Sequence, residues 1–390
     1  QRRARRHREA HGAAHQMTDT PDTDTYALKS ATVAEVAAPD LPYGPPMPKA
    51  WRPRIALVGA GGIAAAHLEA YRDAGFDVAV IASRTLKSAV ARRDAFFPAA
   101  EATDDVERTL ARDDIEVVDL TPHPDQRLPL IETALKAGKH VLSQKPFVLD
   151  LDAGQRLVDL AGEKGRVLAV NQNGRFAPHL SWMREAVRAG LVGDLQSVHV
   201  SIHWDHNWIG GTVFEDLHEL ILYDFAIHWF DFLTSLIGSR ATSVYATTAR
   251  GAGQRVRPPL LAQASVEFDG GQAALLFDGT TRFGSEDATF ITGAKGTLAS
   301  RGPDLGNQAV TLTTEAGRAT PDLKGTWFKE GFRGTMGALL KAVEDKAQPL
   351  NSAAASLEAL ALDFAAIASA RKGDPVRPGS VRSLAAARNA

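Results

Sequence analysis

A glycine turn between a short apolar strand and a helix constrains the fold of this chain more than any other feature. The stretch RIALVGAGGIAAAHLEAYRDAG predicts a buried strand over residues 55–58 and a helix that begins near residue 63. The spacing G-x-G-x-x-A permits a tight turn, a close backbone approach and a free helix N-terminus for a pyrophosphate. Because strand and helix flank the pattern, we interpret it as a dinucleotide-binding turn rather than as an α/β turn that binds nothing. The residues expected to contact the nucleotide are Gly59, Gly61, Gly62, Ile63 and Ala64.

The end of the second predicted strand indicates which dinucleotide is bound. DVAVIASRT places Ser83 and Arg84 where an Asp or Glu would accept hydrogen bonds from the ribose hydroxyls of NAD. A serine hydroxyl and a guanidinium would instead bind the 2′-phosphate of NADP. We therefore expect NADP or NAD as the cofactor, with NADP favoured. The alternative is that Arg84 stacks on the adenine or faces water.

Strands and helices continue to alternate over the next hundred residues. IEVVDLTP, KHVLS and RVLAVNQN predict strands, whereas LPLIETALKAG and LDAGQRLVDLAGEKG predict helices. This alternation predicts a parallel, doubly wound sheet, in which ligands bind beyond the carboxyl ends of the strands. Lys145 follows one such end and should point into the cofactor crevice. Further residues at these ends that we expect at the cofactor are Thr121, Pro122, His123 and Gln144.

A strongly apolar helix is predicted over about residues 217–237, in LHELILYDFAIHWFDFLTSLIG. Asp224, His228 and Asp231 fall at positions i, i+4 and i+7, so a regular helix would place all three on one face. Two carboxylates and an imidazole in line on an apolar helix fit a functional set and a structural one equally well. A hydrogen-bonded structural triad and a stripe that faces solvent are the alternatives.

The second half of the chain predicts a different kind of sheet. From DLQSVHVSIHW onward, segments alternate polar and apolar residues, as strands do when one face is packed and the other is open. The predicted fold class is therefore α/β, with an N-terminal Rossmann domain and a C-terminal α+β domain that carries a large, mostly antiparallel open sheet. We place a disordered, Pro-rich extension at residues 1–51, the dinucleotide-binding domain at 52–174, and the substrate-binding and oligomerisation domain at 175–390.

Composition excludes several classes of function. The chain has no cysteine, which excludes thiolate zinc sites and cysteine nucleophiles. Its formal net charge of -2 provides no basic field, so neither nucleic acid nor a membrane surface is expected as a partner. No apolar run approaches the length of about 18 residues needed to span a bilayer. The arginine cluster QRRARRHRE is followed by no apolar stretch and fails as a secretory signal, so we expect a cytoplasmic protein.

The segment SIHWDHNW could hold a metal ion or shape a substrate pocket. His203 and Asp205 fall on one face of a strand and His206 on the other, which is poor geometry for one ion. We therefore expect no metal. Trp204, His206 and Trp208 are instead expected to form an aromatic-walled pocket suited to a sugar or cyclitol ring.

The motifs taken together resemble those of the Gfo/Idh/MocA oxidoreductases. The glycine turn, TP, GKHVLSQKP, VNQNGRFAP, GLVGDLQSV and LYDFAIHWFD occur in the order that this family has, over about residues 52–300. The resemblance implies that Lys145 donates to the reacting oxygen of the substrate and that the Lys145–Pro146 bond is cis. It further implies that His228 is the general acid/base and that Asp224 binds and orients the substrate. Asn173 and Arg175 would form a polar pair that lines the cleft, Asn173 toward the cofactor and Arg175 toward the substrate.

The chemistry of these side chains agrees with the resemblance. Oxidation of a secondary alcohol needs a base near neutral pKa, such as histidine, and a cation that polarises the developing carbonyl. We therefore predict an NAD(P)-dependent oxidoreductase that acts on a sugar, cyclitol or related polyhydroxy compound and forms a homodimer or homotetramer. A lyase or glycosidase that retains NAD and a catalytically silent Rossmann-type sensor are the alternatives.

One residue departs from the family's pattern. Gln144 stands where the family usually has Glu, so the charged form of Lys145 loses a stabilising neighbour. We expect the Gln144 amide to hydrogen-bond the cofactor instead.

Overall fold

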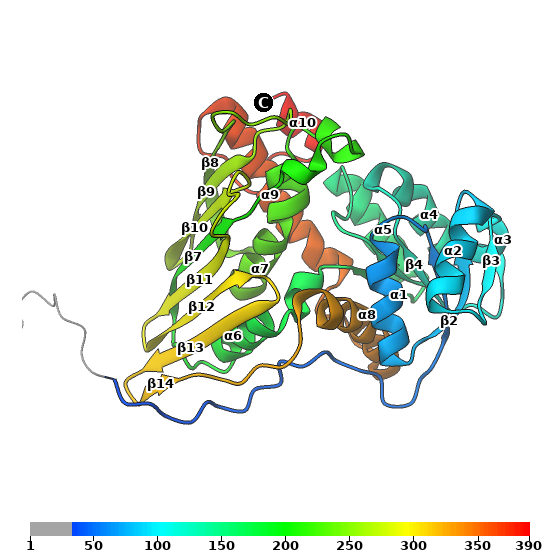
Figure 1. Cartoon of the computed structure of the whole chain (residues 1–390), viewed down its shortest axis with the longest axis horizontal. Coiled ribbons are helices and arrows are strands. Elements are labelled where there is room, and N and C mark those ends of the chain that lie inside the picture. The colour runs from blue at the N-terminus through cyan, green and yellow to red at the C-terminus, as the bar shows by residue number, and fades with distance from the viewer. Residues whose placement is uncertain (1–32) are drawn as a thin grey trace, which may run out of the picture. The chain divides into compact units, whose positions relative to one another are not determined.

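The computed structural model describes residues 33–390, within which Glu35–Ala390 form one compact unit. The arginine cluster and the rest of residues 1–32 lie outside the described residues. The unit is built around two sheets, one parallel and one mostly antiparallel, with helices packed between and around them (Figure 1).

The first sheet is the predicted doubly wound parallel sheet. Its strand order is β3-β2-β1-β4-β5-β6, and every neighbouring pair is parallel. The order reverses between β1 and β4, which is the switch point where such sheets bind ligands. The strands are β1 Arg54–Val58, β2 Asp77–Ala82, β3 Glu101–Thr103, β4 Val117–Leu120, β5 His140–Ser143 and β6 Leu168–Val170. The connecting helices are α1 Ala64–Ala74, α2 Leu86–Phe96, α3 Val106–Ala111, α4 Pro124–Lys136 and α5 Leu151–Glu163.

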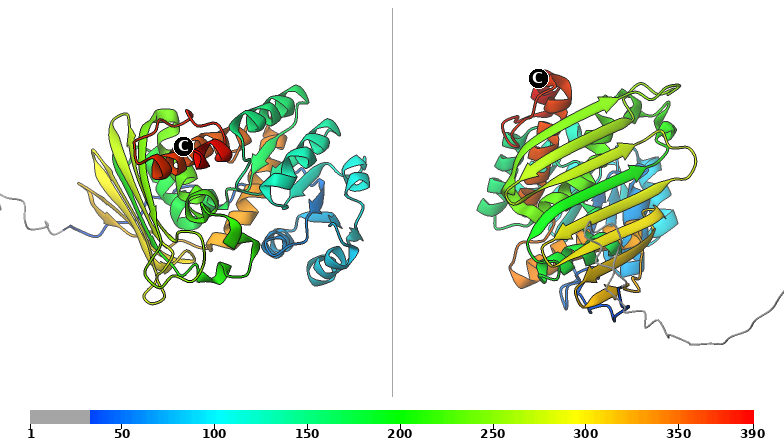
Figure 2. Two further views of the ribbon diagram at one scale, coloured as in Figure 1. Left: turned by 90° about the horizontal axis from the view of Figure 1, so that it is seen from above. Right: turned by 90° about the vertical axis from the view of Figure 1, so that its left-hand side faces the viewer.

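The second sheet has eight strands in the order β14-β13-β12-β11-β7-β10-β9-β8, and only β10 and β7 run parallel. Along β9, buried and exposed residues alternate, because one face packs on the core and the other is open. Figure 2 shows this open face, with the helices behind it. The strands are β7 Leu195–His203, β8 Ala241–Ala249, β9 Leu261–Phe268, β10 Gly271–Asp278, β11 Glu286–Gly293, β12 Gly296–Asp304, β13 Asn307–Thr314 and β14 Gly317–Ala319. The predicted fold class is confirmed.

A helix that the sequence patterns did not predict joins the two halves. This helix, α8 Trp327–Asp345, follows the second sheet in the chain but packs against α1. Phe332 and Met336 of α8 are buried in the same apolar cluster as Ile55 and Leu57 of β1. The core beneath the glycine turn is thus completed by the C-terminal part of the chain. The other helices after β6 are α6 Pro178–Arg188, α7 Ile227–Ile237, α9 Ala353–Lys372 and α10 Leu384–Arg388.

Residues 35–51, here called the N-terminal strap, are ordered rather than disordered as predicted. Val36 N–H donates to Arg318 O beside β14, and the strap then runs along α8. Its end is held by Glu344 of α8, whose carboxylate accepts from three consecutive backbone N–H groups at 2.6, 2.7 and 2.9 Å. These hydrogen bonds lower the pKa of Glu344 to about 2.

Two helical stretches are long and apolar enough to cross a membrane by length and composition, which the run-length criterion did not anticipate. They are Leu220–Arg240 and Ala353–Lys372, and 78% and 67% of their apolar windows are buried inside the protein. Helices α7 and α9 pack against each other in the core. Their apolarity is therefore accounted for by internal packing.

Candidate active site

The glycine turn has the geometry that a dinucleotide requires. Gly59 has φ +102°, and a Cβ at this position would collide with Thr121 Oγ1 from the end of β4. Gly61 and Gly62 face open space, since no atom would lie within 4 Å of an added Cβ. No side chain caps the N-terminus of α1, so no side chain competes with a phosphate for this end of the helix. The residues of this turn therefore fit a dinucleotide.

An arginine that sequence reasoning missed reaches the same turn from α2. Arg92 donates to Ala60 O at 3.3 Å and to Gly61 O at 2.8 Å. At the end of β2, Arg84 is exposed and Ser83 is partly buried. Arg92 belongs to no motif, and only its position on the helix after β2 could have indicated its place.

A second missed arginine ties together the two turns that follow β4 and β5. The side chain of Arg127 is fully buried and donates to Pro122 O at 2.6 Å and also to Pro146 O. Burial lowers the pKa of Arg127 to about 10, against the attraction of Tyr223 and Asp224, so the group stays charged at pH 7. The position of Lys145 relative to the turn at Pro122 is thus set by one guanidinium.

Lys145 and Asp224 meet at the carboxyl end of β5. The Lys145–Pro146 peptide is cis, as the resemblance implied. Lys145 Nζ donates to Asp224 O at 2.7 Å and lies 3.2 Å from Asp224 Oδ1. The two side chains remain 17% and 24% exposed, so a ligand can reach both.

The apolar helix that carries Asp224 is not the regular α-helix that we predicted. Residues Leu220–Ala226 form a π-helical turn, and α7 begins only at Ile227. A π-turn closes every five residues and shifts the side chains that precede it relative to those that follow. Asp224 therefore lies in the π-helical turn, whereas His228 and Asp231 lie on the regular α-helix that follows it.

Arg175 and Asp231 form a buried ion pair, which corrects the prediction that Arg175 binds substrate. Arg175 donates twice to the Asp231 carboxylate, at 2.6 and 2.9 Å, and also to Leu350 O. The two side chains are only 6% and 1% exposed. Asn173 is likewise buried, with its backbone packed against Gly331 of α8, instead of lining an open cleft. Contacts with residues distant in sequence place both side chains in the core. A local sequence pattern does not indicate such contacts.

His228 lies close to Lys145 in a buried setting. Burial and, secondly, the charge of Lys145 lower the pKa of His228 well below 6.5. Its Nδ1 atom has no hydrogen-bond partner within the described residues. Trp327, the first residue of α8, packs edge-on against the imidazole at 5.4 Å between ring centroids. His228 is thus neutral at pH 7, and its Nδ1 atom is buried without a hydrogen-bond partner among the described residues.

Gln144 points away from the cofactor crevice, contrary to the prediction. Its Oε1 accepts from Lys145 N–H at 2.6 Å and from Asn171 Nδ2 at 3.0 Å. Its amide nitrogen lies 3.3 Å from His67 Nε2, and His67 Nδ1 in turn bonds Asp119 Oδ2 at 2.7 Å. All of these side chains are buried. Gln144 therefore binds the backbone of Lys145 from the buried side.

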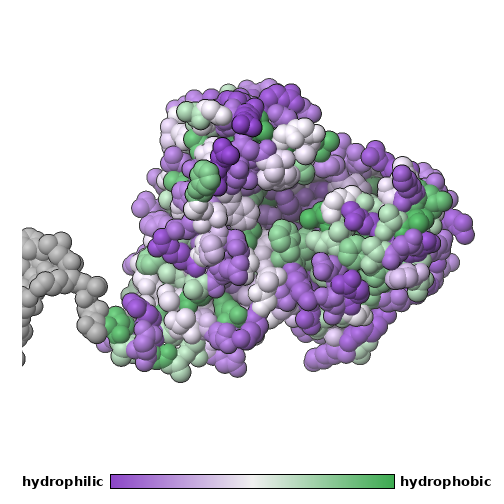
Figure 3. Space-filling model, viewed as in Figure 1, coloured by the Kyte–Doolittle hydropathy of each residue, from purple (hydrophilic) through white to green (hydrophobic). Residues whose placement is uncertain are grey.

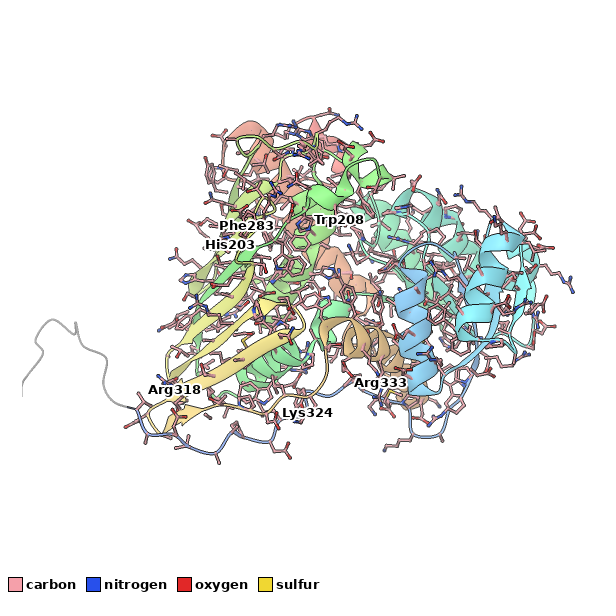
Figure 4. The ribbon with its side chains drawn as sticks, viewed as in Figure 1. His203, Trp208, Phe283, Arg318, Lys324 and Arg333 are labelled. Carbon is pink, nitrogen blue, oxygen red and sulfur yellow. The ribbon has the colours of Figure 1, made fainter. Side chains whose placement is uncertain are left out.

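Aromatic side chains form a row between the two halves. His206 packs on Phe225 at 4.3 Å, Trp208 lies 5.7 Å from Phe214, and Phe214 lies 5.9 Å from His123 of the nucleotide half. Burial lowers the pKa of His206 to about 4, although Asp224 opposes the shift. Trp208 is exposed and is labelled in Figure 4 between the second sheet and the nucleotide half.

The proposed metal ligands do not assemble. His203 bonds Ser201 and Asp205 caps the turn at Asn207. Among the described residues no group of three or more His, Cys, Asp or Glu could hold a metal ion.

Comparison with known proteins was made by sequence and by structure. A family described as "Oxidoreductase family, NAD-binding Rossmann fold" matches residues 53–172, and "GFO/IDH/MocA C-terminal domain" matches residues 180–299. An inositol 2-dehydrogenase of Rhizobium meliloti is 26% identical over 81% of this chain and 96% of its own length. A D-apiose dehydrogenase of Paraburkholderia graminis is 26% identical over 85% of this chain and 91% of its own.

The solved structures agree in fold. An oxidoreductase from Agrobacterium radiobacter in complex with NAD+, L-tartaric acid and magnesium superposes with a TM-score of 0.77. It is 20% identical and covers 85% of this chain and 99% of its own. A putative myo-inositol dehydrogenase from Sinorhizobium meliloti has a TM-score of 0.70, is 24% identical, and covers 84% of this chain and all of its own.

Proposed function

The chain belongs to the Gfo/Idh/MocA family of oxidoreductases, and from that premise we propose that it interconverts a secondary alcohol and a carbonyl on a sugar, cyclitol or related polyhydroxy compound. The observation that carries the proposal is the accessible Lys145–Asp224 pair beside a neutral His228 at the end of β5. Relatives named as inositol and D-apiose dehydrogenases support a polyhydroxy substrate.

Each of the three side chains has a distinct proposed role. Lys145 donates a hydrogen bond to the alcohol oxygen and stabilises negative charge as the proton leaves. His228 accepts that proton, because an imidazole that is neutral at pH 7 can act as a base. Asp224 accepts a hydrogen bond from a neighbouring hydroxyl and orients the ring. A bound nicotinamide supplies the redox step itself.

NADP is the proposed cofactor, ahead of NAD. Ser83 and the exposed Arg84 follow β2, and Arg92 adds a second cation beside the glycine turn. No carboxylate stands in the position that would repel a 2′-phosphate. Calorimetric titration should therefore give tighter binding of NADPH than of NADH, and Ser83→Asp should reverse the order. Equal affinities in the wild-type protein would contradict this preference.

A spectrophotometric screen tests the proposed activity. The protein is mixed with NADP or NAD and a panel of free sugars, cyclitols and sugar acids, and cofactor reduction is followed. We expect reduction with at least one polyol, and loss of that signal in Lys145→Met. A cofactor that copurifies and is never turned over would instead indicate the transient oxidation used by a lyase or glycosidase. Reversible cofactor binding with no reduction by any polyol would instead indicate a catalytically silent sensor.

Assembly and location belong to the same proposal. Tyr245 and Phe290 are exposed on the second sheet, which suits a homodimer or homotetramer formed through the open face. Light scattering on the wild-type protein and on Phe290→Glu tests this, because the charge should dissociate the assembly. We also propose that the enzyme works in the cytoplasm.

A further inference from the structure

A chamber of about 670 Å³ lies beside the Lys145–Asp224 pair. Its walls come from the first turn of α4, the segment between β5 and α5, the π-helical turn with the segment before it, and α10. Figure 3 shows the surface hollowed between the two halves of the molecule. Pockets of this volume enclose ligands of drug size, whereas a single six-membered ring would leave much of the space empty.

The walls of the chamber are mainly apolar. Leu149, Val213, Phe214 and Leu217 line it together with prolines of the two turns. Val213 is 66% exposed and Leu149 is 37% exposed, which leaves large apolar side chains in contact with solvent at one place. Grouped apolar exposure of this kind marks a binding surface, since a ligand that covers it removes apolar area from water.

The charged groups of the chamber are largely engaged with other residues. Asp150 accepts from Ala153 N–H as the cap of α5, and Arg388 donates to Glu219 at 2.7 Å. Asp125 alone among the lining carboxylates has no hydrogen bond or ion pair within the described residues. Arg388 is the only lysine or arginine among the described lining residues, and its charge is already paired with the Glu219 carboxylate.

Asp224 lines the chamber and also contacts Lys145, so the chamber opens onto the proposed reacting centre. We infer that the chamber receives the non-reacting part of the substrate, and that this part is an uncharged, largely apolar substituent on the polyhydroxy ring, as in an aryl or alkyl glycoside. The inference rests on the proposed function and narrows its substrate class. None of the glycine-turn residues lines the chamber, whereas His123, which is expected at the cofactor, does, so the test below also measures cofactor affinity.

The test compares free and substituted polyols on the enzyme loaded with cofactor. Myo-inositol, D-glucose, D-galactose and D-xylose are each paired with their O-phenyl derivative, and kcat/KM and calorimetric Kd are measured. The same measurements are made on Leu149→Trp, which fills the chamber. The matched control is Leu350→Trp, because Leu350 is also 37% exposed but lies outside the chamber.

We expect the wild-type enzyme to favour a phenyl derivative by about tenfold or more in kcat/KM or Kd, because burial of one ring is worth at least that factor. Leu149→Trp should remove this preference, while kcat/KM for unsubstituted polyols and the cofactor affinity stay within about threefold of wild type. The control Leu350→Trp should change neither the preference nor these values.

Three results would overturn the inference. These are equal use of free and phenyl polyols, a Leu149→Trp variant that keeps the preference, and a variant that loses cofactor affinity, which would assign the chamber to the dinucleotide. Failure of the proposed function is distinguishable, because phenyl derivatives would then bind in a manner sensitive to Leu149→Trp without any cofactor reduction.

Discussion

Two ion pairs use carboxylates seven residues apart on one helical stretch, yet their surroundings differ. Lys145 and Asp224 are 3.2 Å apart and partly exposed, whereas Arg175 and Asp231 are 2.6 Å apart and almost fully buried. Arg175 directs its donors to a carboxylate and a carbonyl inside the protein. Lys145 touches only Asp224 and can still donate to a ligand. A reactive ion pair differs from a structural one in its exposure to solvent and in the hydrogen-bond donors that it leaves unused. The charges of the two pairs are the same.

The largest effect on catalysis should come from His228→Ala. Loss of the proposed base should lower kcat by about 10² to 10⁴-fold, because this is the factor that a positioned general base typically contributes. Cofactor affinity and the melting temperature should stay close to wild type. Steady-state kinetics with calorimetry decides this, and a variant that retains the wild-type rate would remove His228 from the mechanism.

Replacing Lys145, the cation of the exposed pair, should lower kcat almost as much. Lys145→Met should lower kcat by about 10² to 10³-fold, since one donor to the developing charge is lost. The pH dependence of the remaining activity should also change. A base works when unprotonated, and the Lys145 charge lowers the pKa of His228 in addition to burial. Removing that charge raises the pKa of His228, so the acid limb of the pH–rate profile should move upward.

Breaking the buried Arg175–Asp231 pair should lower the stability of the fold and leave the catalytic rate almost unchanged. Asp231→Ala leaves the Arg175 guanidinium unpaired in the core, which should lower the free energy of unfolding by about 3 to 5 kcal/mol. The kcat per folded molecule should change by less than about threefold. Chemical denaturation and active-site titration separate the two quantities, with Arg175→Met/Asp231→Ala as the control that removes the stranded charge. A large loss of kcat in fully folded Asp231→Ala would place this pair in the mechanism.

Arg127 belongs to neither class, because it is a buried cation with no carboxylate in contact among the described residues. Arg127→Lys keeps the charge, but one ammonium cannot hold both Pro122 O and Pro146 O in the fork geometry of a guanidinium. We expect kcat to fall about tenfold through displacement of Lys145, with the Kd of the cofactor within about threefold. A loss of cofactor affinity equal to the loss in kcat would argue for a general disturbance of the nucleotide half.

Local patterns predicted the parts of the fold whose causes are local. The glycine turn, the alternation of strands and helices and the place of Lys145 follow from periodicity and from residues near in sequence. Helix α8 was missed because its glycines lower helix propensity and read as loop signals. In the structure these glycines serve close packing, since a Cβ at Gly334 would collide with Phe176 and one at Gly337 with Pro46 O of the strap.

The differences between the predicted and observed site come from an ion pair and a helix irregularity. Arg175 was assigned to the cleft, but Asp231 lies 56 positions further along and holds it in the core. Asp224 was assigned to a regular α-helix, but it lies in a π-helical turn. Neither an ion pair between separate elements nor a π-turn leaves a periodic signal in one sequence.

The smallest effect is expected from Gln144→Glu, which places a carboxylate beneath the reactive pair. Glutamate can keep the hydrogen bonds from Lys145 N–H and Asn171, and its second oxygen would face His67 Nε2. His67 Nε2 lies within hydrogen-bond reach of this oxygen, so the new charge would be held on the buried side and would reach Lys145 Nζ only weakly. A nearby negative charge favours the ammonium, so the alkaline limb of the pH–rate profile should move upward.

Compensation by His67 limits the size of this shift. We expect about half a unit or less, with the protein folded and active. In Gln144→Glu/His67→Phe the carboxylate has no proton partner, so the shift should grow or the protein should lose stability. An upward shift of a full unit in the single variant would mean that His67 does not isolate the site. The buried network would then tune the charge of Lys145 directly, and the reactive pair would depend on the core beneath it as much as on the cleft above.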